Sequence, residues 1–370
     1  MDALHGRQTI YEAPLRNILI GVCTAVSCCP ALAQSNVSLY GSQDVGIGYF
    51  NNVGGSSKWT TVNTMSPDRF GLVGQEDLGG GLKTVFRLEN GFYTTTGAMA
   101  LPGTIFNRQA YVGLTKERLG TITLGRQTPF NFDWLGPLST AYNAADWYMF
   151  HPGNIDELAA TSNVQYSNSL KFTTSNYGGL TAGAMLGLGN TANFGFGRNL
   201  SVGINFERGP LRASAVYSDE HNRSVLVSTT GLSMFQGQPA SSYMADRIEN
   251  MGAGATYNVV DTLTLHALYT RTKLTSGQRS DVYQTIDGGA TYRLTPAYSI
   301  AAGAFTTTLA GMRWTEYTVG SVYALSKATQ LYADALLEKA SGGAKAAIFT
   351  VGPSSNGTQL GVIAGLHHSF

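Results

Sequence analysis

The sequence predicts an all-β fold, an antiparallel up-and-down transmembrane β-barrel of about 16 strands. Three observations support this prediction. Short segments alternate apolar and polar side chains along most of the chain, as strands with one apolar and one polar face do. Short turns alternate with long polar loops between these segments, as in a barrel that has short turns at one rim and long loops at the other. The final segment places Leu360, Val362, Leu366 and Phe370 on one face and ends on that phenylalanine.

The composition agrees with a barrel and argues against a helical membrane protein. Charged residues make up 13% of the 370-residue chain, against about 25% in a typical soluble protein. No stretch after the N-terminal region approaches the ~18 consecutive apolar residues that a membrane-spanning helix needs. The net charge of +1 gives no indication of a nucleic-acid partner.

The N-terminus resembles a secretory signal peptide over residues 1–33. Arg7 and Arg16 supply the basic start, residues 18–26 are apolar, and residues 31–33 (Ala-Leu-Ala) fit a cleavage site. A mature barrel would then occupy residues 34–370, and all three cysteines would be removed with the signal. A lipoprotein anchored through Cys28 or Cys29 remains an alternative.

The first half of the chain supplies five predicted strands. Residues 82–93 give the clearest alternation, because Leu82, Phe86 and Leu88 share one parity while Arg87 and Glu89 share the other. By the same parity argument Tyr40, Asp44 and Lys83 are predicted to face the lumen of the barrel. The five predicted strands span residues 37–49, 68–75, 82–93, 106–115 and 120–127, with a polar loop at residues 51–65.

The second half supplies eleven more strands, mostly as pairs joined by short turns. Their predicted ranges are 169–175, 180–188, 198–207, 211–219, 248–258, 262–273, 281–293, 297–308, 313–325, 329–338 and 359–370. An even total lets an up-and-down barrel close with both chain ends on one rim.

Residues 128–168 form the longest region without alternation, and we call them the 128–168 segment. An irregular segment of this length within a compact domain is usually functional. It contains no lysine or arginine, and Asn154 is expected to cap a short helical turn. Its acidic residues are Asp133, Asp146, Asp156 and Glu157.

Several stretches of the chain resemble the general diffusion porins of Gram-negative bacteria, most of all the group found in Burkholderia, Bordetella and Neisseria. The stretches are SLYGSQDVGIGY, RFGLVGQEDLGGGLKTVFRLENGF, FNRQAYVGL, GTITLGRQ and the terminal GLHHSF. The resemblance implies an outer-membrane homotrimer that is exported through the periplasm and passes small hydrophilic solutes and ions. It also implies contact with outer-membrane lipid and lipopolysaccharide, and a third extracellular loop, the 128–168 segment, folded inward as a constriction.

The resemblance also assigns residues to that constriction. Arg69, Arg108 and Lys171 match basic wall positions, and Glu89 matches a wall glutamate. Arg87 stands where many relatives are uncharged, so it is expected to add one positive charge. The acids Asp133, Asp146, Asp156 and Glu157 are expected to face these cations, although the choice among them stays open. Phe370 matches the C-terminal signal that barrel-assembly machinery recognises.

Other interpretations of these residues remain. Arg87 and Glu89 also suit an exposed cross-strand pair on a soluble sheet. Val112 and Leu114 share the parity of Arg108, so the pore position of Arg108 depends on the resemblance. A soluble secreted β-protein, an outer-membrane adhesin and an outer-membrane enzyme are further rivals, but no nucleophile–base pair is visible and no cofactor is expected. A solute-specific channel would need an aromatic track, for which the segment offers Trp134, Tyr142, Trp147 and Tyr148.

The sequence shows no metal centre. The histidines after the predicted signal have no metal-ligand spacing with cysteines or carboxylates. They are His151, His221, His266, His367 and His368. Four candidate cations and five candidate acids leave the ion preference undecided.

Overall fold

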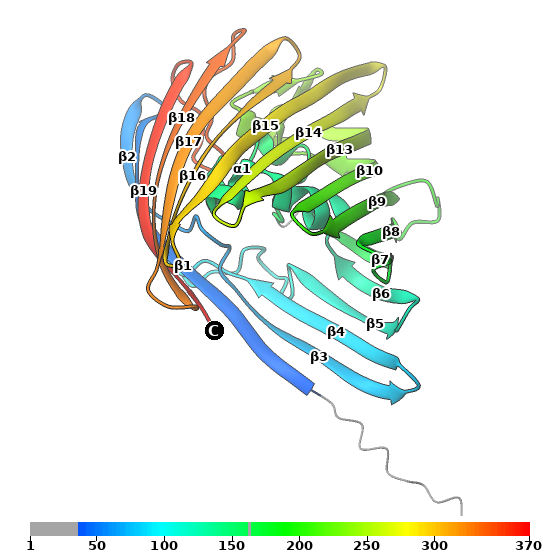
Figure 1. Ribbon diagram of the computed structural model, residues 1–370. Coiled ribbons are helices and arrows are strands. Elements are labelled where there is room, and N and C mark those ends of the chain that lie inside the picture. Colours follow the sequence, from blue (N-terminus) through cyan, green and yellow to red (C-terminus); the bar gives the residue numbers. More distant parts are fainter. Residues whose placement is uncertain (1–35, 162–163) are drawn as a thin grey trace, which may run out of the picture. The chain divides into compact units, whose positions relative to one another are not determined.

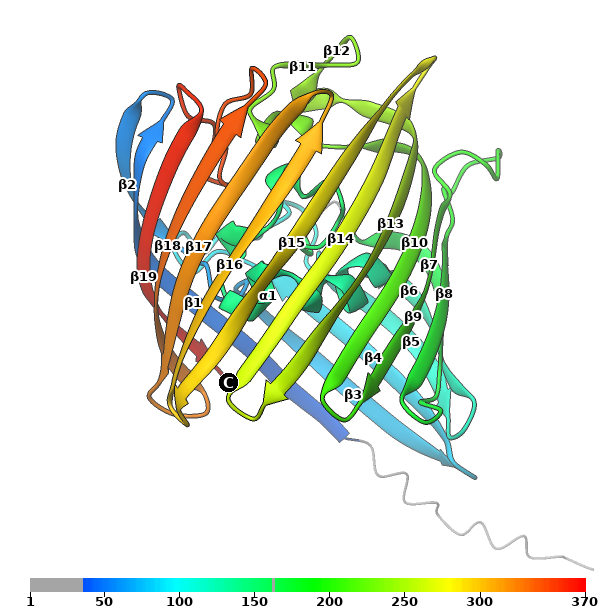
Figure 2. The same cartoon turned by 45° about the horizontal axis from the view of Figure 1, so that its top comes forward.

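The computed structural model describes residues 36–161 and 164–370, so the predicted signal peptide lies outside the described residues. Alternation of apolar and polar residues produces a single large antiparallel sheet (Figures 1 and 2). The strands of this sheet are β1 (Asn36–Val53), β2 (Ser56–Val62), β3 (Arg69–Gly79), β4 (Leu82–Gly91), β5 (Gln109–Lys116), β6 (Gly120–Gln127), β7 (Tyr166–Thr174), β8 (Leu180–Gly187), β9 (Asn199–Arg208), β10 (Leu211–Ser224), β13 (Met244–Val260), β14 (Leu263–Ser276), β15 (Arg279–Thr295), β16 (Tyr298–Leu309), β17 (Met312–Ala324), β18 (Thr329–Ser341) and β19 (Thr358–Ser369).

The sheet closes into a barrel of 16 strands. From β3 onward each strand pairs with the next strand of the wall, and β1 pairs with β19 to close the ring. Strand β2 pairs with the later part of β1, and β3 pairs with its first part, so together they form one interrupted wall strand. The predicted fold and strand number are therefore confirmed. The small hairpin of β11 (Met234–Phe235) and β12 (Gln238–Pro239) lies outside this sheet.

One expectation about the wall is wrong. Residues 51–65 were expected to form a loop, but β1 continues to Val53 and β2 occupies much of the remainder. Asn52, Gly54 and Gly55 make the tight turn, in which the amide of Gly55 donates to Oδ1 of Asn52 at 3.0 Å. Small polar residues hide the alternation here, since they do not distinguish the two faces of a strand.

The two faces of the wall differ as the alternation predicts. On β1, Leu39 and Ile47 are 64% and 62% exposed, whereas Asp44 and Phe50, on the other parity, are buried. Exposed apolar side chains recur on the outward parity of other strands, for example Val112 and Val319. This pattern matches a barrel with lipid outside and polar groups inside. Within the described residues, no helix is both long and apolar enough to cross a membrane.

The 128–168 segment folds into short helices between β6 and β7. These are the π-helix η1 (Asn131–Leu135), the 3₁₀ helices η2 (Gly136–Leu138), η3 (Trp147–Met149) and η4 (Pro152–Asn154), and α1 (Thr140–Ala144). Ser139 caps α1, and Ala145 ends it in the left-handed region with φ of 59°. Asn154 does not cap a following helix as expected; its side-chain amide instead bonds both the N–H and the C=O of Ala159, at 2.8 and 2.9 Å.

Strands on several sides hold this segment. The hydroxyl of Thr291 on β15 donates to the carbonyl of Asn143 at 2.9 Å, and that of Tyr283 donates to the carbonyl of Pro152 at 2.9 Å. Asn250 on β13 donates to the carbonyl of Asp156 at 2.9 Å. The apolar core of the segment, including Leu135, Leu138, Met149 and Leu158, has no exposed surface. Packing and wall contacts therefore fix a segment that lacks long regular structure.

Candidate functional site

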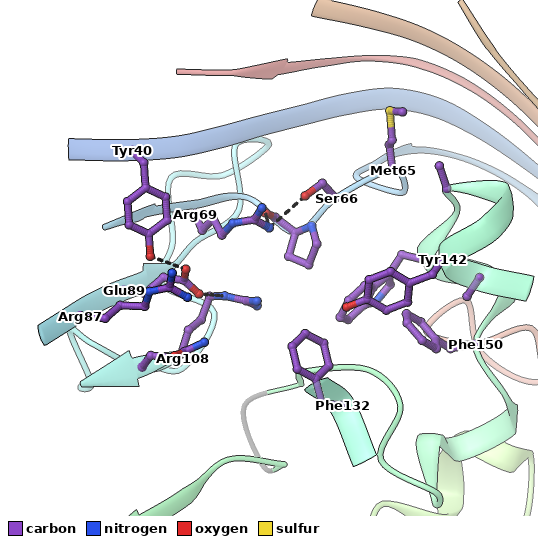
Figure 3. A pocket seen from close by; sticks show the side chains of 15 residues that line it. Tyr40, Met65, Ser66, Arg69, Arg87, Glu89, Arg108, Phe132, Tyr142 and Phe150 are labelled. Atoms are coloured by element: carbon purple, nitrogen blue, oxygen red, sulfur yellow. Dashed lines mark hydrogen bonds and ion pairs between the residues drawn. The ribbon is translucent and has the colours of Figure 1, made fainter. Parts of the chain in front are cut away.

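A cavity of about 380 Å³ lies between the wall strands β1, β3 and β4 and the 128–168 segment (Figure 3). Figure 3 shows the guanidinium groups of Arg69, Arg87 and Arg108 beside Glu89 on one side of this cavity. The rings of Phe132, Tyr142 and Phe150 lie on the other side. We call this space the arginine cavity. Met65, Ser66, Pro67, Gln109 and Trp147 also line it.

Strand register brings the charged residues of the wall together. Gly71 on β3 pairs with Glu89 on β4, and Val73 pairs with Arg87, so Arg69, Arg87 and Glu89 fall on one face. Arg108 precedes β5, which begins at Gln109. Strict alternation therefore does not apply to it, and the parity that it shares with Val112 does not decide its direction.

Glu89 is engaged by two neighbours. Its Oε1 lies 2.6 Å from Nε of Arg108, and its Oε2 accepts a hydrogen bond from the hydroxyl of Tyr40 at 2.6 Å. Both Glu89 and Arg108 are largely buried, which strengthens an ion pair relative to one in open water. The pair neutralises one of the three arginines.

Arg69 and Arg87 retain most of their donors. Nη1 of Arg69 donates to Oγ of Ser66 at 2.9 Å and to the carbonyl of Pro67 at 3.4 Å. Arg87 lies over the ring of Tyr40, 5.6 Å from its centroid, and its buried Nε has no hydrogen-bond partner. Three guanidinium groups against one carboxylate leave the arginine cavity positively charged.

The opposite side of the cavity is aromatic. Tyr142 meets Phe132 at 6.2 Å and Phe150 at 5.8 Å, both edge to face. Trp147 meets Phe150 at 5.0 Å in the same manner. Phe150 is buried at 3% exposure, whereas Tyr142 is 41% exposed. The buried ring therefore supports the ring that faces the cavity.

A second basic group lies beyond Arg87, in a cavity of about 230 Å³ that Asp133 and Lys171 line together with Arg87. Lys171 on β7 pairs with Asp133, and its ammonium lies 4.7 Å from the centroid of the Phe130 ring. It also donates to the carbonyl of Thr128 at 2.9 Å. One of the expected pairs between a wall cation and an acid of the segment thus forms here.

The other three acids of the segment do not pair with Arg69, Arg87 or Arg108. Asp156 contacts Nδ1 of His151 at 2.6 Å and accepts from the hydroxyl of Thr270 at 2.7 Å. Glu157 lies 3.3 Å from Nη1 of Arg223. Asp146 is buried, and its carboxylate accepts from the amide of Tyr148 at 2.8 Å. The expected pairing across the gap is therefore not made by these three acids, because other parts of the chain bind them.

Burial also changes the protonation of Asp146. Removal of its carboxyl from water raises the pKa to about 7, although the hydrogen bond from the Tyr148 amide opposes the rise. The carboxyl is therefore partly neutral near pH 7. It adds less negative charge to the interior than its residue type suggests.

The remaining predicted residues occupy distinct places. Asp44 shares the inward parity of Tyr40 but is buried, where it accepts from the amides of Thr64 and Met65 at 3.1 and 3.0 Å and from the hydroxyl of Tyr332 at 2.7 Å. Lys83 shares the parity of Arg87 further along β4 and is half-buried. Phe370 pairs with Gly41 through two backbone hydrogen bonds of 2.9 and 3.1 Å.

Comparison with known proteins decides the family. The sequence matches the Gram-negative porin family over residues 21–342. This chain is a Gram-negative porin. It is 32% identical over 226 residues to an outer membrane porin protein of Bordetella pertussis, covering 52% of this chain and 56% of that protein. It is 25% identical to outer membrane porin protein 32 of Delftia acidovorans, covering 96% of this chain and all of that protein.

Solved porin structures share the fold. An anion-selective porin from Comamonas acidovorans superposes with a TM-score of 0.76 at 23% identity, covering 91% of this chain and all of that one. A trimer form of OmpT from Vibrio cholerae gives 0.66 at 13% identity, covering 91% and 99%. Family and relatives place this porin in the outer membrane as a diffusion channel.

Four cavities of this porin are adjacent in a series, because each shares lining residues with the next. A cavity of about 360 Å³ shares Arg108 and Trp147 with the arginine cavity. The arginine cavity shares Arg87 with the cavity at Lys171. That cavity in turn shares Tyr111 and two threonines with one of about 390 Å³. Within the described residues, no group of three or more acidic, histidine or cysteine side chains is arranged to hold a metal.

Sequence reasoning missed part of the porin's aromatic lining. Phe132 and Phe150 line the arginine cavity but were not singled out, and the FNFDW stretch that contains Phe132 was the available signal. Tyr142 and Trp147 line the cavity as an aromatic track requires. Trp134 does not, because it stacks on Phe130 at 4.1 Å. Tyr148 packs edge-on against Phe50 at 5.7 Å and lines the neighbouring cavity instead.

Proposed function

We propose that this porin is a passive, non-enzymatic channel for small hydrophilic solutes and that it prefers anions. The observation that carries the proposal is the charge of the arginine cavity. Arg69, Arg87 and Arg108 face a single carboxylate there, and Glu89 is already bound by Arg108 and Tyr40. The expected counter-charges of the segment are bound elsewhere, apart from Asp133, which pairs with Lys171.

A positive site of this kind favours anions for an electrostatic reason. Rings of charged side chains set the ion preference of a pore, and basic rings suit anions. The field is stronger in a narrow passage with low-dielectric walls than in open solution. The solved Comamonas porin, whose title calls it anion-selective, agrees with this direction.

We further propose that the 128–168 segment is the third extracellular loop and narrows the channel as its constriction. The proposal is supported by contacts between the segment and residues on the polar face of the wall, such as the 2.9 Å bond from the Thr140 amide to Asp287 on β15. Both views draw the helices of the segment within the ring of strands (Figures 1 and 2). Its aromatic side then forms the wall of the passage opposite the arginines.

The outward surface supports the remaining proposals. Its apolar side chains suit contact with outer-membrane lipid and lipopolysaccharide, and with further copies of the chain in a homotrimer. The trimer form of the OmpT neighbour agrees with self-association. Phe370, whose backbone pairs with Gly41, is the residue that barrel-assembly machinery would recognise.

The test is the reversal potential of single channels in a planar bilayer under a salt gradient. Its sign is expected to be that of an anion-preferring pore. Arg87→Ala is expected to lower the anion-to-cation permeability ratio by about twofold or more, because it removes a charge that the described residues do not neutralise. Arg271→Ala is the matched control, since Arg271 lies between the buried Thr270 and Thr272 on β14 and so has the outward parity.

The outcome that contradicts the proposal is equally definite. A reversal potential of the cation-preferring sign would show that the arginines do not determine the field of the passage. An equal change in both variants would show that Arg87 acts only through the total charge of the protein.

A further inference from the structure

The two sides of the arginine cavity have different chemistry, and simple ions use only one of them. The guanidinium groups offer charge and hydrogen-bond donors, whereas Phe132, Tyr142 and Trp147 offer ring surfaces (Figure 3). A chloride or phosphate ion gains nothing from the rings, which favour an apolar or aromatic group. The inference below rests on the proposed channel function and extends it to a class of solute.

The arginine side has an open position for a carboxylate. Within the described residues Arg87 makes no hydrogen bond or ion pair, and its Nε is buried and unpartnered. A guanidinium group without a protein acceptor keeps its terminal N–H donors for an incoming carboxylate. Glu89 does not bond to Arg87; its two oxygens contact Arg108 and Tyr40 instead. Arginine binds carboxylates through two parallel N–H bonds, which a single carboxylate of a solute supplies.

The aromatic side has an open position for a ring. Tyr142 is 41% exposed and is supported from behind by the buried Phe150. Phe132 and Trp147 extend the same surface, through Tyr142 and Phe150 respectively. Aromatic rings pair favourably in offset or edge-to-face arrangements, and a ring held by its neighbours loses little conformational freedom when a second ring packs on it.

We propose that the arginine cavity binds solutes in which a carboxylate is attached to one aromatic ring, as in benzoate. The carboxylate occupies the side of Arg87 and Arg69, and the ring lies against Tyr142 and its neighbours. The cavity volume of about 380 Å³ lies near the lower end of the range of small-molecule sites, roughly 300–1,000 Å³. A channel conducts a solute only when binding is weak enough for the solute to leave as well as enter.

Benzoate added to single channels in chloride salt provides the test. Benzoate is expected to reduce the chloride current in a saturable manner. Acetate, which lacks the ring, and benzyl alcohol, which lacks the charge, are expected to have little effect at equal concentration. A current reduction by acetate equal to that by benzoate would overturn the role of the rings.

Two substitutions separate the two sides. Tyr142→Ala is expected to weaken the apparent affinity for benzoate by about three- to tenfold, in line with the loss of one aromatic contact. Because it removes no charge, the reversal potential is expected to keep its anion-preferring sign. Tyr142→Phe keeps the ring and is expected to retain benzoate affinity. Arg87→Ala is expected to weaken the apparent affinity for benzoate by at least about tenfold, because a charged hydrogen-bonded contact is lost.

Controls make each failure distinguishable. Tyr269→Ala removes an exposed ring on β14 next to the buried Thr270, so it leaves the arginine cavity unchanged. Each variant must insert and conduct, which shows that it is folded. An anion-preferring channel with no preference for benzoate over acetate overturns this inference and leaves the proposed function intact. A cation-preferring channel overturns the proposed function itself.

Discussion

At the scale of single residues, Arg87 and Glu89 lie two positions apart on one face of β4 but have different surroundings. Glu89 is held by Arg108 and by Tyr40, so its charge is offset within the wall. Arg87 rests on the ring of Tyr40 and has no acceptor for its Nε. Tyr40 thus contacts both residues, and the difference in their partners is what leaves the cavity positive.

Replacement of the cavity's one carboxylate tests this charge balance. Glu89→Gln is expected to raise the anion-to-cation permeability ratio by about twofold or more, because it leaves Arg108 without its counter-charge. The measurement is again the reversal potential in a salt gradient. Glu207→Gln, at an exposed position on β9, is the control for net charge. An unchanged ratio in Glu89→Gln would mean that the ion pair lies outside the path of the ions.

At the scale of elements, a buried network joins the 128–168 segment to the wall. His151 contacts Asp156 of the segment at 2.6 Å through Nδ1 and Asp287 of β15 at 3.1 Å through Nε2. Asp287 also accepts from the amide of Thr140, and Asp156 accepts from Thr270 of β14. The histidine therefore links the two carboxylates that fasten the segment.

This network predicts a dependence of stability on pH. Burial by itself lowers the pKa of His151, but the carboxylates of Asp156 and Asp287 outweigh it and raise the pKa from 6.5 to about 10. The charged form therefore stabilises the folded protein fully below about pH 6.5, and the contribution is lost as the pH rises to about 10. The melting temperature in detergent is expected to fall over this window, by an amount that reflects at most a few kcal/mol.

The variant His151→Gln isolates this effect. It lacks the titrating group, so its melting temperature is expected to be lower near about pH 6 and to change much less up to about pH 10. An equal pH dependence in the variant would assign the effect to other groups.

A glycine of the wall gives a second test of how the segment is seated. A Cβ at Gly303 on β16 would lie 2.5 Å from Cγ2 and 2.6 Å from Oγ1 of Thr140, at the start of α1. Gly303→Ala is expected to displace α1 and to cost about 1–3 kcal/mol, as overpacking of a filled interior does. Thermal unfolding measures the cost. Gly288→Ala, on the adjacent strand β15, is the control because its Cβ would meet nothing closer than 3.3 Å.

At the scale of the whole barrel, local sequence patterns predicted most of the wall. The alternation in residues 82–93 predicted that Arg87 and Glu89 share one face of β4, and the register of β3 with β4 agrees. The same argument predicted that Tyr40 faces the lumen, and Tyr40 lines the arginine cavity. Strand number and closure followed because alternation and turn length are properties of short stretches. Strand β3 was predicted, but β2, the other part of the same interrupted wall strand, was missed where Gly and Ser conceal the alternation.

The interior of the barrel was less predictable from sequence. Asp156 meets Thr270, and Thr140 meets Asp287, across more than a hundred residues in each case. Such contacts leave no periodic signal. The family resemblance instead led to the expectation that the acids of the segment face the arginines. The aromatic side of the cavity was partly found, through Tyr142 and Trp147, because those residues lie in the long irregular stretch.

The pairing of β1 with β19 makes the wall a ring with a seam, where Val45 lies opposite Leu366. All other neighbours in the ring follow one another along the chain, so the seam alone joins its two ends. In a chain without β19, β1 and β18 would become edge strands, each with a row of unpaired N–H and C=O groups. Hydrocarbon does not satisfy such groups. Removal of one strand therefore does not produce a narrower barrel. It produces an open sheet whose unpaired edges are unfavourable in the bilayer.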